Sequence, residues 1–339
     1  MNLHKNEQNN EKGFFNKLKS FSLLGNFTIR KITFVGILIA LAVVFYIVVV
    51  QIFPLVASNP GWKSSFIGLP IKISGFIFGP AIGGLVALCS DLISFLLLPG
   101  AYNPIYTMVA MVSGIVAGIT GKLFLNVFKF MLSGDFRISN IDQKIYSISD
   151  KIRSLKLAFN ENSKQIRKLE DQMIQLYLKR QSIMIKKNES MLVNFNLIIA
   201  LILLITTIIA MIYIFGYLIP QDIIDRSIIP SRIGLIIIIN SGFCSMSVFL
   251  VIARFKMSHH KYIIIVPIVI MSMWIELINV PLLAYADQSF ASGIPDDILV
   301  YMFQYIIISP VKIWFNLLII YYTYIIINPL ITKNSKISY

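Results

Sequence analysis

The sequence predicts an all-α membrane protein, and three observations support this fold class. Hydrophobic residues make up 57% of the 339 residues, charged residues only 14%, and the mean hydropathy is +0.77. A soluble domain has about one quarter charged residues, so this apolar excess must face lipid. Apolar runs long enough for a transmembrane helix also recur along the chain. Together these features exclude a secreted domain, a cytosolic enzyme and a disordered protein.

The positive charges are the third observation, because they gather between the apolar runs. The net charge is +14, and 25 of the 30 Lys and Arg residues fall in four blocks. These blocks are residues 1–31, 122–190, 254–261 and 332–339. The positive-inside rule places all four on the cytoplasmic side, so both termini are expected there, in a multi-pass plasma-membrane protein. Anionic lipid is a second expected partner. No nucleic-acid partner is expected, because the blocks lack interleaved aromatic residues and known binding motifs.

The first expected element is a transmembrane helix over Ile32–Phe53, which ends at Pro54. It follows a basic leader and has no A-x-A site after it, so we interpret it as a retained span and not as a cleaved signal peptide. The last apolar segment contains Pro310, which predicts either a kink or a short lead-in followed by a helix from Ser309. The other full-length spans are expected at Ile105–Phe124, Met191–Ile219, Ile233–Ala253, Tyr262–Ala286 and Ile298–Ile331.

A broken helix pair is expected between the first two full spans. Phe66–Phe78 is too short to cross a membrane alone, and it meets Ala81–Leu98 at Gly79-Pro80. Irregular backbone at membrane depth persists where it lines a cavity or is buried in protein, so either a cavity or a packing kink is expected here. Four glycines would allow close helix approach: Gly75, Gly79, Gly83 and Gly84.

Residues 126–190 differ in character, because they are charged and carry a heptad repeat. The 3,4 spacing of the apolar residues predicts a narrow coiled-coil seam. Both ends of the segment join spans on one side, so it must turn back, and residues 160–163 offer the turn. We expect an antiparallel cytoplasmic hairpin with arms of about 25 residues that reach about 35 Å. It is either a self-packed spacer or a docking surface. The seam residues are Ile138, Ile141, Ile145, Ile148, Ile152, Leu155, Phe159, Ile166, Leu169, Met173 and Leu176.

The chain therefore divides into six expected regions. The hairpin interrupts the series of membrane segments. The regions are a basic tail at 1–31, the first membrane segments at 32–125, the hairpin at 126–190, two transmembrane helices and a basic loop at 191–261, the last two transmembrane helices at 262–332 and a tail at 333–339.

Charged residues inside the predicted spans are few, so each one is informative. Lys72 and Asp91 lie at similar depths, about 10 Å from the outer surface. Glu276 and Lys312 also lie at matching depths. Two acid–base pairs are therefore predicted, Lys72/Asp91 and Glu276/Lys312. They are either structural ion pairs or the lining of a polar pocket, and Asn279 shares the helix face of Glu276.

Aromatic residues near these charges complete the set of candidate binding residues. Trp274, Tyr102 and Tyr106 have the chemistry to stack on a flat ring or to cover a cavity, and each is equally suited to anchor the chain at the membrane interface. Asn103, next to Tyr102, is the remaining candidate.

The ordered motifs of the chain resemble a known family. Residues 68–84 contain the pattern LP-x4-G-x3-GP-x2-G, followed by Ser90-Asp91, Tyr102-Asn103-Pro104 and Ser113-Gly114. Residues 274–279 and 310–316 extend the agreement. This order is similar to the substrate-binding S component of energy-coupling factor (ECF) vitamin transporters, and among these most similar to the folate type.

The resemblance implies a six-helix core that binds a vitamin from outside, with loops 54–65 and 99–104 as gates. It also implies partners, a transmembrane coupling subunit and two ATP-binding-cassette ATPases, and a toppling motion that turns the loaded site inward. In the family, small residues on the first helix dock the coupling subunit, and Gly36 and Ala40 stand at the matching spacing here.

Two departures from the family bear on the ligand. The segment 126–261 has no counterpart in the six-helix core, so the resemblance implies that the hairpin and the two transmembrane helices of 191–261 are an insertion into that core. No Arg follows Arg254, although a guanidinium fork would suit paired carboxylates best, so Lys72 or Lys312 would have to substitute. Riboflavin, thiamin or a nucleobase-like ligand therefore stay open beside folate. A non-transporting scaffold that acts through the hairpin is the alternative from a different class.

No enzyme motif occurs in the sequence. G-x-x-x-x-G-K-[ST], H-E-x-x-H, C-x-x-C and G-x-S-x-G are all missing, so no catalytic residue, metal or cofactor is predicted, and ATP hydrolysis is expected of partner subunits. Cys89 and Cys244 both lie in apolar segments, where they are expected to be buried and unpaired by a disulfide.

Overall fold

The computed structural model describes residues 29–52, 68–97, 102–132, 134–158, 164–185, 189–226, 229–290 and 297–332. In these ranges every regular element is a helix, and no strand occurs. Six helices are long and apolar enough to cross a membrane. The predicted all-α membrane fold is therefore confirmed. Residues 1–28 of the basic leader, the predicted gate at 54–65, residues 99–101 of the second predicted gate, the hairpin turn and the C-terminal tail lie outside the described residues.

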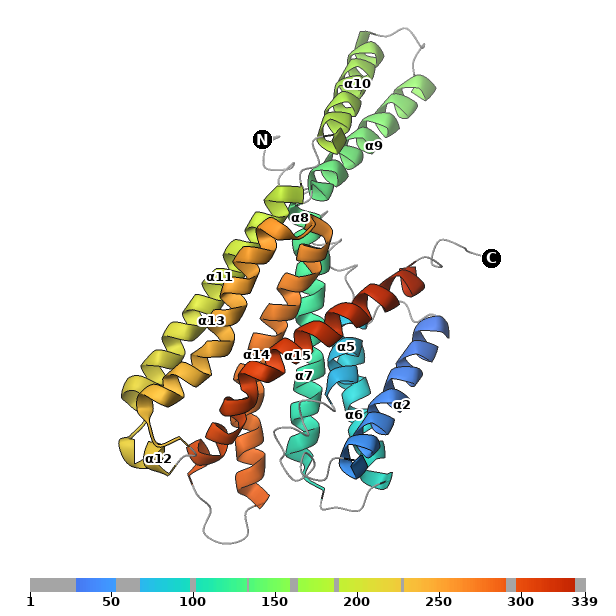
Figure 1. Ribbon diagram of the computed structural model, residues 1–339. Helices are drawn as coiled ribbons and strands as arrows, with labels where there is room; N and C mark the ends of the chain where they lie inside the picture. Colours follow the sequence, from blue (N-terminus) through green and yellow to red (C-terminus); the bar gives the residue numbers. More distant parts are fainter. Residues whose placement is uncertain are drawn as a thin grey trace. The chain divides into compact units, whose positions relative to one another are not determined.

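Contacts divide the described chain into two compact units, drawn in Figure 1. We call residues 29–125 and 196–332 the membrane unit and residues 126–195 the hairpin unit. The helices of the membrane unit are α2 (Ile29–Ile52), α5 (Leu69–Phe78), α6 (Pro80–Leu97), α7 (Pro104–Lys122), most of α11 (Glu189–Tyr213), the π-helix η2 (Ile214–Leu218), α12 (Gln221–Asp225), α13 (Arg232–Lys256), α14 (His259–Phe290) and α15 (Ile298–Thr332).

The helix α14 is the most deeply buried span of the membrane unit. It packs against α7, α13 and α15, while α5 and α6 pack against α7 and α2 packs against α5 and α6. The helix α15 also contacts α5 and α13. Apolar side chains of α7, α13, α14 and α15 form one core cluster, and a second cluster lies between α5 and α6. This packing places α5, α7, α14 and α15 around a common interior.

The broken helix pair forms as predicted, and glycine explains its geometry. Gly79 has a φ of +102°, which L side chains rarely adopt, and Pro80 begins α6 directly after it. A Cβ atom added at Gly83 would lie 2.4 Å from the carbonyl oxygen of Gly114 on α7. A Cβ atom at Gly75 would lie 2.1 Å from the same oxygen. The broken pair therefore packs backbone to backbone against α7.

For the last helix, a kink at Pro310 and a separate lead-in before Ser309 are the two predicted forms. It is a single helix from Ile298 to Thr332 with Pro310 inside it, so the alternative of a short separate lead-in is wrong. Helical structure also extends into two stretches between the predicted spans, residues 220–232 and 287–297. The helix α12 occupies part of 220–232, and α14 continues to Phe290. Both differences are accompanied by side-chain hydrogen bonds that the apolar pattern does not encode.

Arg232 shows this hydrogen bonding at the first of these stretches. Its guanidinium donates to the carbonyl oxygens of Phe215, Gly216 and Ile219 at 3.2, 2.6 and 3.0 Å. These carbonyls lie in and just after η2, where the helix ends and they lack partners along the chain. One side chain at the start of α13 thus ties the ends of the two extra spans together.

The two cysteines are free, as expected, but their predicted burial is wrong. Cys89 is partly exposed, and Cys244 is exposed on α13. An apolar helix in a membrane protein presents part of its surface to lipid, so an apolar sequence context does not imply burial.

The hairpin unit contains two long helices, α9 (Asp135–Ala158) and α10 (Lys164–Ile185). The π-helix η1 (Leu123–Phe128) and α8 (Lys129–Leu132) connect α7 to them. Ion pairs join Lys156 to Glu170 at 3.1 Å and Arg180 to Asp142 at 2.6 Å. Those two pairings require antiparallel helices, which Figure 1 shows. The described seam positions are buried or half-buried: Ile138, Ile141, Ile145, Ile148, Ile152, Leu155, Ile166, Leu169, Met173 and Leu176.

The glycine contact gives a first testable prediction. Gly83→Ala should lower the free energy of unfolding by about 1–3 kcal/mol, because the added methyl meets backbone that cannot move aside. Gly36→Ala is the matched control, since nothing lies within 4 Å of a Cβ added at Gly36. It should be neutral or slightly stabilising, because alanine favours helix. Unfolding of the purified protein in detergent measures both variants, and equal effects would contradict the proposed close contact.

Candidate functional site

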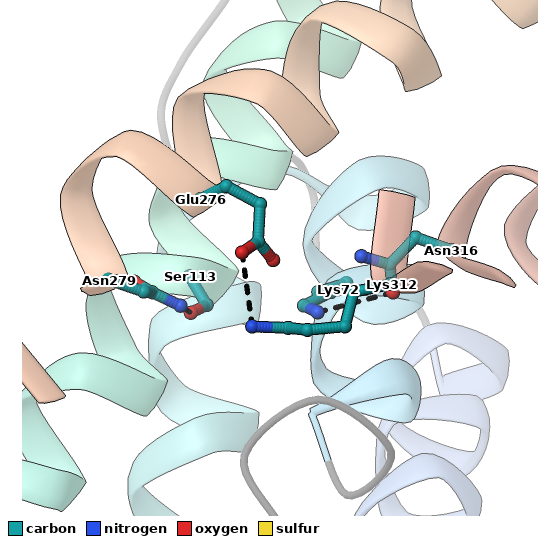
Figure 2. A network of polar contacts seen from close by, with 6 residues as sticks. All are labelled: Lys72, Ser113, Glu276, Asn279, Lys312 and Asn316. Carbon is teal, nitrogen blue, oxygen red and sulfur yellow. Dashed lines mark hydrogen bonds and ion pairs between the residues drawn. The ribbon is translucent and has the colours of Figure 1, made fainter. Parts of the chain in front are cut away.

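Six buried polar side chains form a cluster inside the membrane unit, which we call the polar centre. They come from α5, α7, α14 and α15, and each is at most 6% exposed. Figure 2 shows them pointing toward one another. Polar groups are costly inside a membrane protein unless they are partnered, so a cluster of this size marks a candidate functional site. Its members are Lys72, Ser113, Glu276, Asn279, Lys312 and Asn316.

Three contacts hold the polar centre together. Lys312 Nζ donates to Glu276 Oε2 at 3.0 Å, and Lys72 Nζ donates to Asn316 Oδ1 at 3.2 Å. Asn279 Nδ2 donates to Ser113 Oγ at 2.6 Å. The predicted Glu276/Lys312 ion pair is therefore confirmed. Side chains of α5, α7, α14 and α15 thus meet in one cluster.

The predicted Lys72/Asp91 pair is wrong. Asp91 instead accepts a hydrogen bond from Thr107 Oγ1 at 2.5 Å, and the Tyr102 hydroxyl lies 2.9 Å from the same Thr107 oxygen. Matching depths placed Lys72 and Asp91 at similar heights, but they contain no information on direction around the bundle. Lys72 extends toward α15, whereas Asp91 on α6 meets the beginning of α7.

The charges of the polar centre do not balance. Two lysines face one glutamate, which leaves a net charge of +1 when all three are ionised. Lys72 is 2% exposed, and it donates to the neutral side-chain amide of Asn316. Two further atoms there, Asn279 Oδ1 and Asn316 Nδ2, have no hydrogen-bond partner among the described residues. With all three groups ionised, the polar centre thus combines a net positive charge with an amide acceptor and an amide donor that lack partners among the described residues.

Tyr102 and Tyr106 lie near the start of α7, outside the polar centre. Tyr106 and Tyr305 both donate to the carboxylate of Asp287, which joins α7, α14 and α15. Asn103 caps α7 by accepting from the Ile105 N–H at 2.9 Å, and its amide donates to Ser289 Oγ at 3.0 Å. These contacts fix helix ends to one another.

Tyr102 and Trp274 complete the account of the predicted residues. The ring of Tyr102 packs on Phe95 with 4.9 Å between ring centroids, and Tyr102 is 40% exposed. Trp274 is half-buried on α14. It lies two residues before Glu276, so it projects from a different face of the helix.

Four residues with polar roles were not among the sequence candidates. Asn316 lies four residues after Lys312 and therefore shares its helix face, a spacing that would have indicated it. Ser113 and Thr107 belong to the α7 motif, but hydroxyl groups in membrane helices commonly bond their own backbone. Asp287 was assigned to a loop because the apolar run ends at Ala286. Its pairing with two tyrosines is visible only in three dimensions.

The small residues predicted to dock a partner lie on an open face of α2. Gly36 and Ala40 are both exposed, and so are Ile37, Leu41 and Val44. The opposite face of α2, with Leu38, Ala42 and Val43, is buried. Within the described part of the chain, the face that carries Gly36 and Ala40 is therefore not used for internal packing. Among the same residues no group of three or more His, Cys, Asp or Glu is arranged to hold a metal ion.

Comparison with known proteins gives two partial similarities. No protein-family model matches the chain, and no solved structure matches it. A stretch of 52 residues is 36% identical to "Folate transporter FolT" of Clostridium novyi and covers 15% of this chain and 30% of that protein. A stretch of 103 residues is 27% identical to "Uncharacterized protein MG098 homolog" of Mycoplasma pneumoniae and covers 29% of this chain and 22% of that protein.

The matched stretches span less than a third of either relative. The chain is a multi-pass membrane protein with a partial similarity to a transporter. This supports a transporter-like role.

The ion pair gives a second testable prediction. Glu276→Gln should lower the free energy of unfolding by about 3–5 kcal/mol, because it leaves two buried ammonium groups without a carboxylate. Lys156→Met in the hairpin is the control. Its partner Glu170 is 40% exposed, so this change should cost about 0–1 kcal/mol. Unfolding experiments on both variants and on Glu276→Gln/Lys312→Met check this. A double variant no more stable than Glu276→Gln alone would contradict the buried pair.

Proposed function

We propose that this chain is the vitamin-binding S component of an ATP-driven ECF-type importer, and that folate or a related vitamin is its ligand. The observation that carries this proposal is the polar centre, a buried cluster with a net positive charge in a membrane bundle. The partial similarity to a protein named as a folate transporter and the ordered motifs of α5, α6 and α7 support it.

The chemistry of the polar centre favours an anionic ligand with hydrogen-bonding groups. A ligand carboxylate would neutralise the excess charge by accepting from Lys72, and charge-assisted hydrogen bonds of this kind are among the strongest in proteins. Asn279 Oδ1 would accept from a ligand N–H, and Asn316 Nδ2 would donate to a ligand oxygen or ring nitrogen. Folate carries both carboxylates and such ring groups. Riboflavin and thiamin lack a carboxylate, so neither could form such an ion pair with Lys72.

The partner side of the proposal concerns α2. Its open face with Gly36 and Ala40 is the proposed contact with the transmembrane coupling subunit, because small residues let two helices approach closely. The two ATPases would bind that subunit and not this chain. Both termini and the hairpin unit are proposed to be cytoplasmic, since the basic blocks flank the spans there.

The ligand proposal is tested by mass spectrometry of the small molecule that co-purifies, followed by titration with folate. Lys72→Met should weaken folate binding by roughly 10- to 100-fold, since a hydrogen bond to a charged group contributes about 1.5–3 kcal/mol. Lys256→Met, an exposed lysine at the end of α13, should bind like the parent. Equal affinity of the parent and Lys72→Met would refute the proposed contact.

The partner proposal is tested by co-purification. Gly36→Leu and Ala40→Leu together should abolish recovery of a coupling subunit and two ATPases, while folate binding by the isolated chain stays unchanged. Ile37→Ala, on the same face, removes bulk and should not block the contact. Unchanged recovery with both leucines present would place the coupling subunit elsewhere.

A scaffold role through the hairpin is the second candidate, and one observation favours it. Three apolar or aromatic side chains of α10 are exposed: Ile174, Tyr177 and Leu178, at 55%, 51% and 61%. They form a candidate contact surface for another protein. The scaffold role is supported if deletion of residues 137–190 abolishes all partner binding while the Gly36→Leu and Ala40→Leu variants bind partners like the parent.

A further inference from the structure

The span α13 contacts α15, the helix that supplies Lys312 and Asn316 to the polar centre. Three α13 residues, Gly242, Ser245 and Phe249, meet Pro310 and Trp314 of α15. Trp314 Nε1 donates to Ser245 Oγ at 3.1 Å, and the rings of Trp314 and Phe249 meet edge to face at 5.2 Å. We call these five residues the α13–α15 seam.

The seam lies on the opposite side of α15 from the polar centre. Lys312 and Asn316 are four residues apart and share one face, whereas Trp314 lies midway between them in sequence and projects from the other. Lys312 reaches Glu276 and Asn316 receives Lys72, while Trp314 is held by α13. A single helical turn thus connects the seam to both polar contacts.

Pro310 makes this part of α15 dependent on its neighbour. A proline in a helix removes one backbone hydrogen bond and clashes with the preceding turn, so the helix axis there is set by what packs against it. Gly242 packs at this point, and a Cβ added to it would lie 3.0 Å from Pro310 Cα. Glycine therefore allows α13 to approach the proline this closely, and a larger residue at position 242 would force the two helices apart by a few tenths of an ångström or more.

The two polar contacts tolerate little movement. They measure 3.0 and 3.2 Å, and hydrogen bonds weaken steeply beyond about 3.5 Å. A shift of α15 by about 1 Å at Lys312 would break or reorganise them.

We propose that α13 is a positioning element of the binding site: through Gly242 and Trp314 it fixes the turn of α15 that carries Lys312 and Asn316. As a statement about ligand binding this rests on the proposed function above. It assigns a role to one of the two spans that a six-helix core would not contain. Gly242 and Trp314 are positioning residues, because they act through Lys312 and Asn316.

The test measures the ion pair itself and needs no ligand. Glu276→Gln and Lys312→Met are made singly and together, and their non-additivity in thermal unfolding midpoint gives the coupling between the two side chains. The cycle is repeated in a Gly242→Leu background. The control background is Ser241→Leu, which adds a similar side chain to an exposed neighbouring position. All variants are full-length chains in lipid nanodiscs.

The coupling should fall by at least half in Gly242→Leu and stay at the parent value in Ser241→Leu. A coupling that is unchanged in Gly242→Leu, or reduced equally in both backgrounds, would overturn the proposal, even if the unfolding midpoint drops. Should Gly242→Leu fail to fold, Ser245→Ala and Trp314→Phe remove the seam hydrogen bond with little change in volume, and the same criteria apply to them.

Folate titration of the same backgrounds separates this proposal from the proposed function. Weaker folate binding in Gly242→Leu than in Ser241→Leu supports both. Reduced coupling with no folate binding by any variant, the parent included, supports the positioning role of α13 and counts against folate as the ligand.

Discussion

The structure of the membrane unit depends on the requirement that charge buried in an apolar bundle be partnered. Lys72, Glu276 and Lys312 come from three helices, and none of them is more than 6% exposed. Each would be costly alone, so the fold that satisfies one of them constrains the others. The helices α5, α14 and α15 are held in mutual register by this requirement. The incomplete balance of charge then makes the same cluster suitable for an anion.

The glycine contact between the broken helix pair and α7 makes that arrangement possible. A short helix that ends within the membrane leaves its last backbone groups in need of partners. Gly75 and Gly83 let the pair lie directly on α7 at Gly114, so the break is enclosed by protein. This close approach also sets how far Lys72 on α5 extends toward α15. Small residues and charged residues therefore act together, the first by bringing the backbones close and the second by specifying which faces meet.

The two spans that follow the hairpin differ in how they pack. The helix α13 packs on α15 behind the polar centre, whereas α11 is mostly exposed. A hairpin with exposed apolar residues on α10 adds a surface that the membrane unit does not need for its own packing.

The sequence by itself determined the helices, their approximate limits and the seam of the hairpin, because apolar periodicity and chain breaks are local properties. Matching depth in lipid also predicted that Glu276 and Lys312 pair, which the structure confirms, but the same argument failed for Lys72 and Asp91. The tertiary structure alone decided that Lys72 meets Asn316 and not Asp91, because depth does not give direction around a bundle. It also decided that Asp287 joins Tyr106 and Tyr305, and that α13 packs behind Lys312. These contacts join residues from different helices, and the rotation of each helix about its axis is fixed by the packing of all of them together.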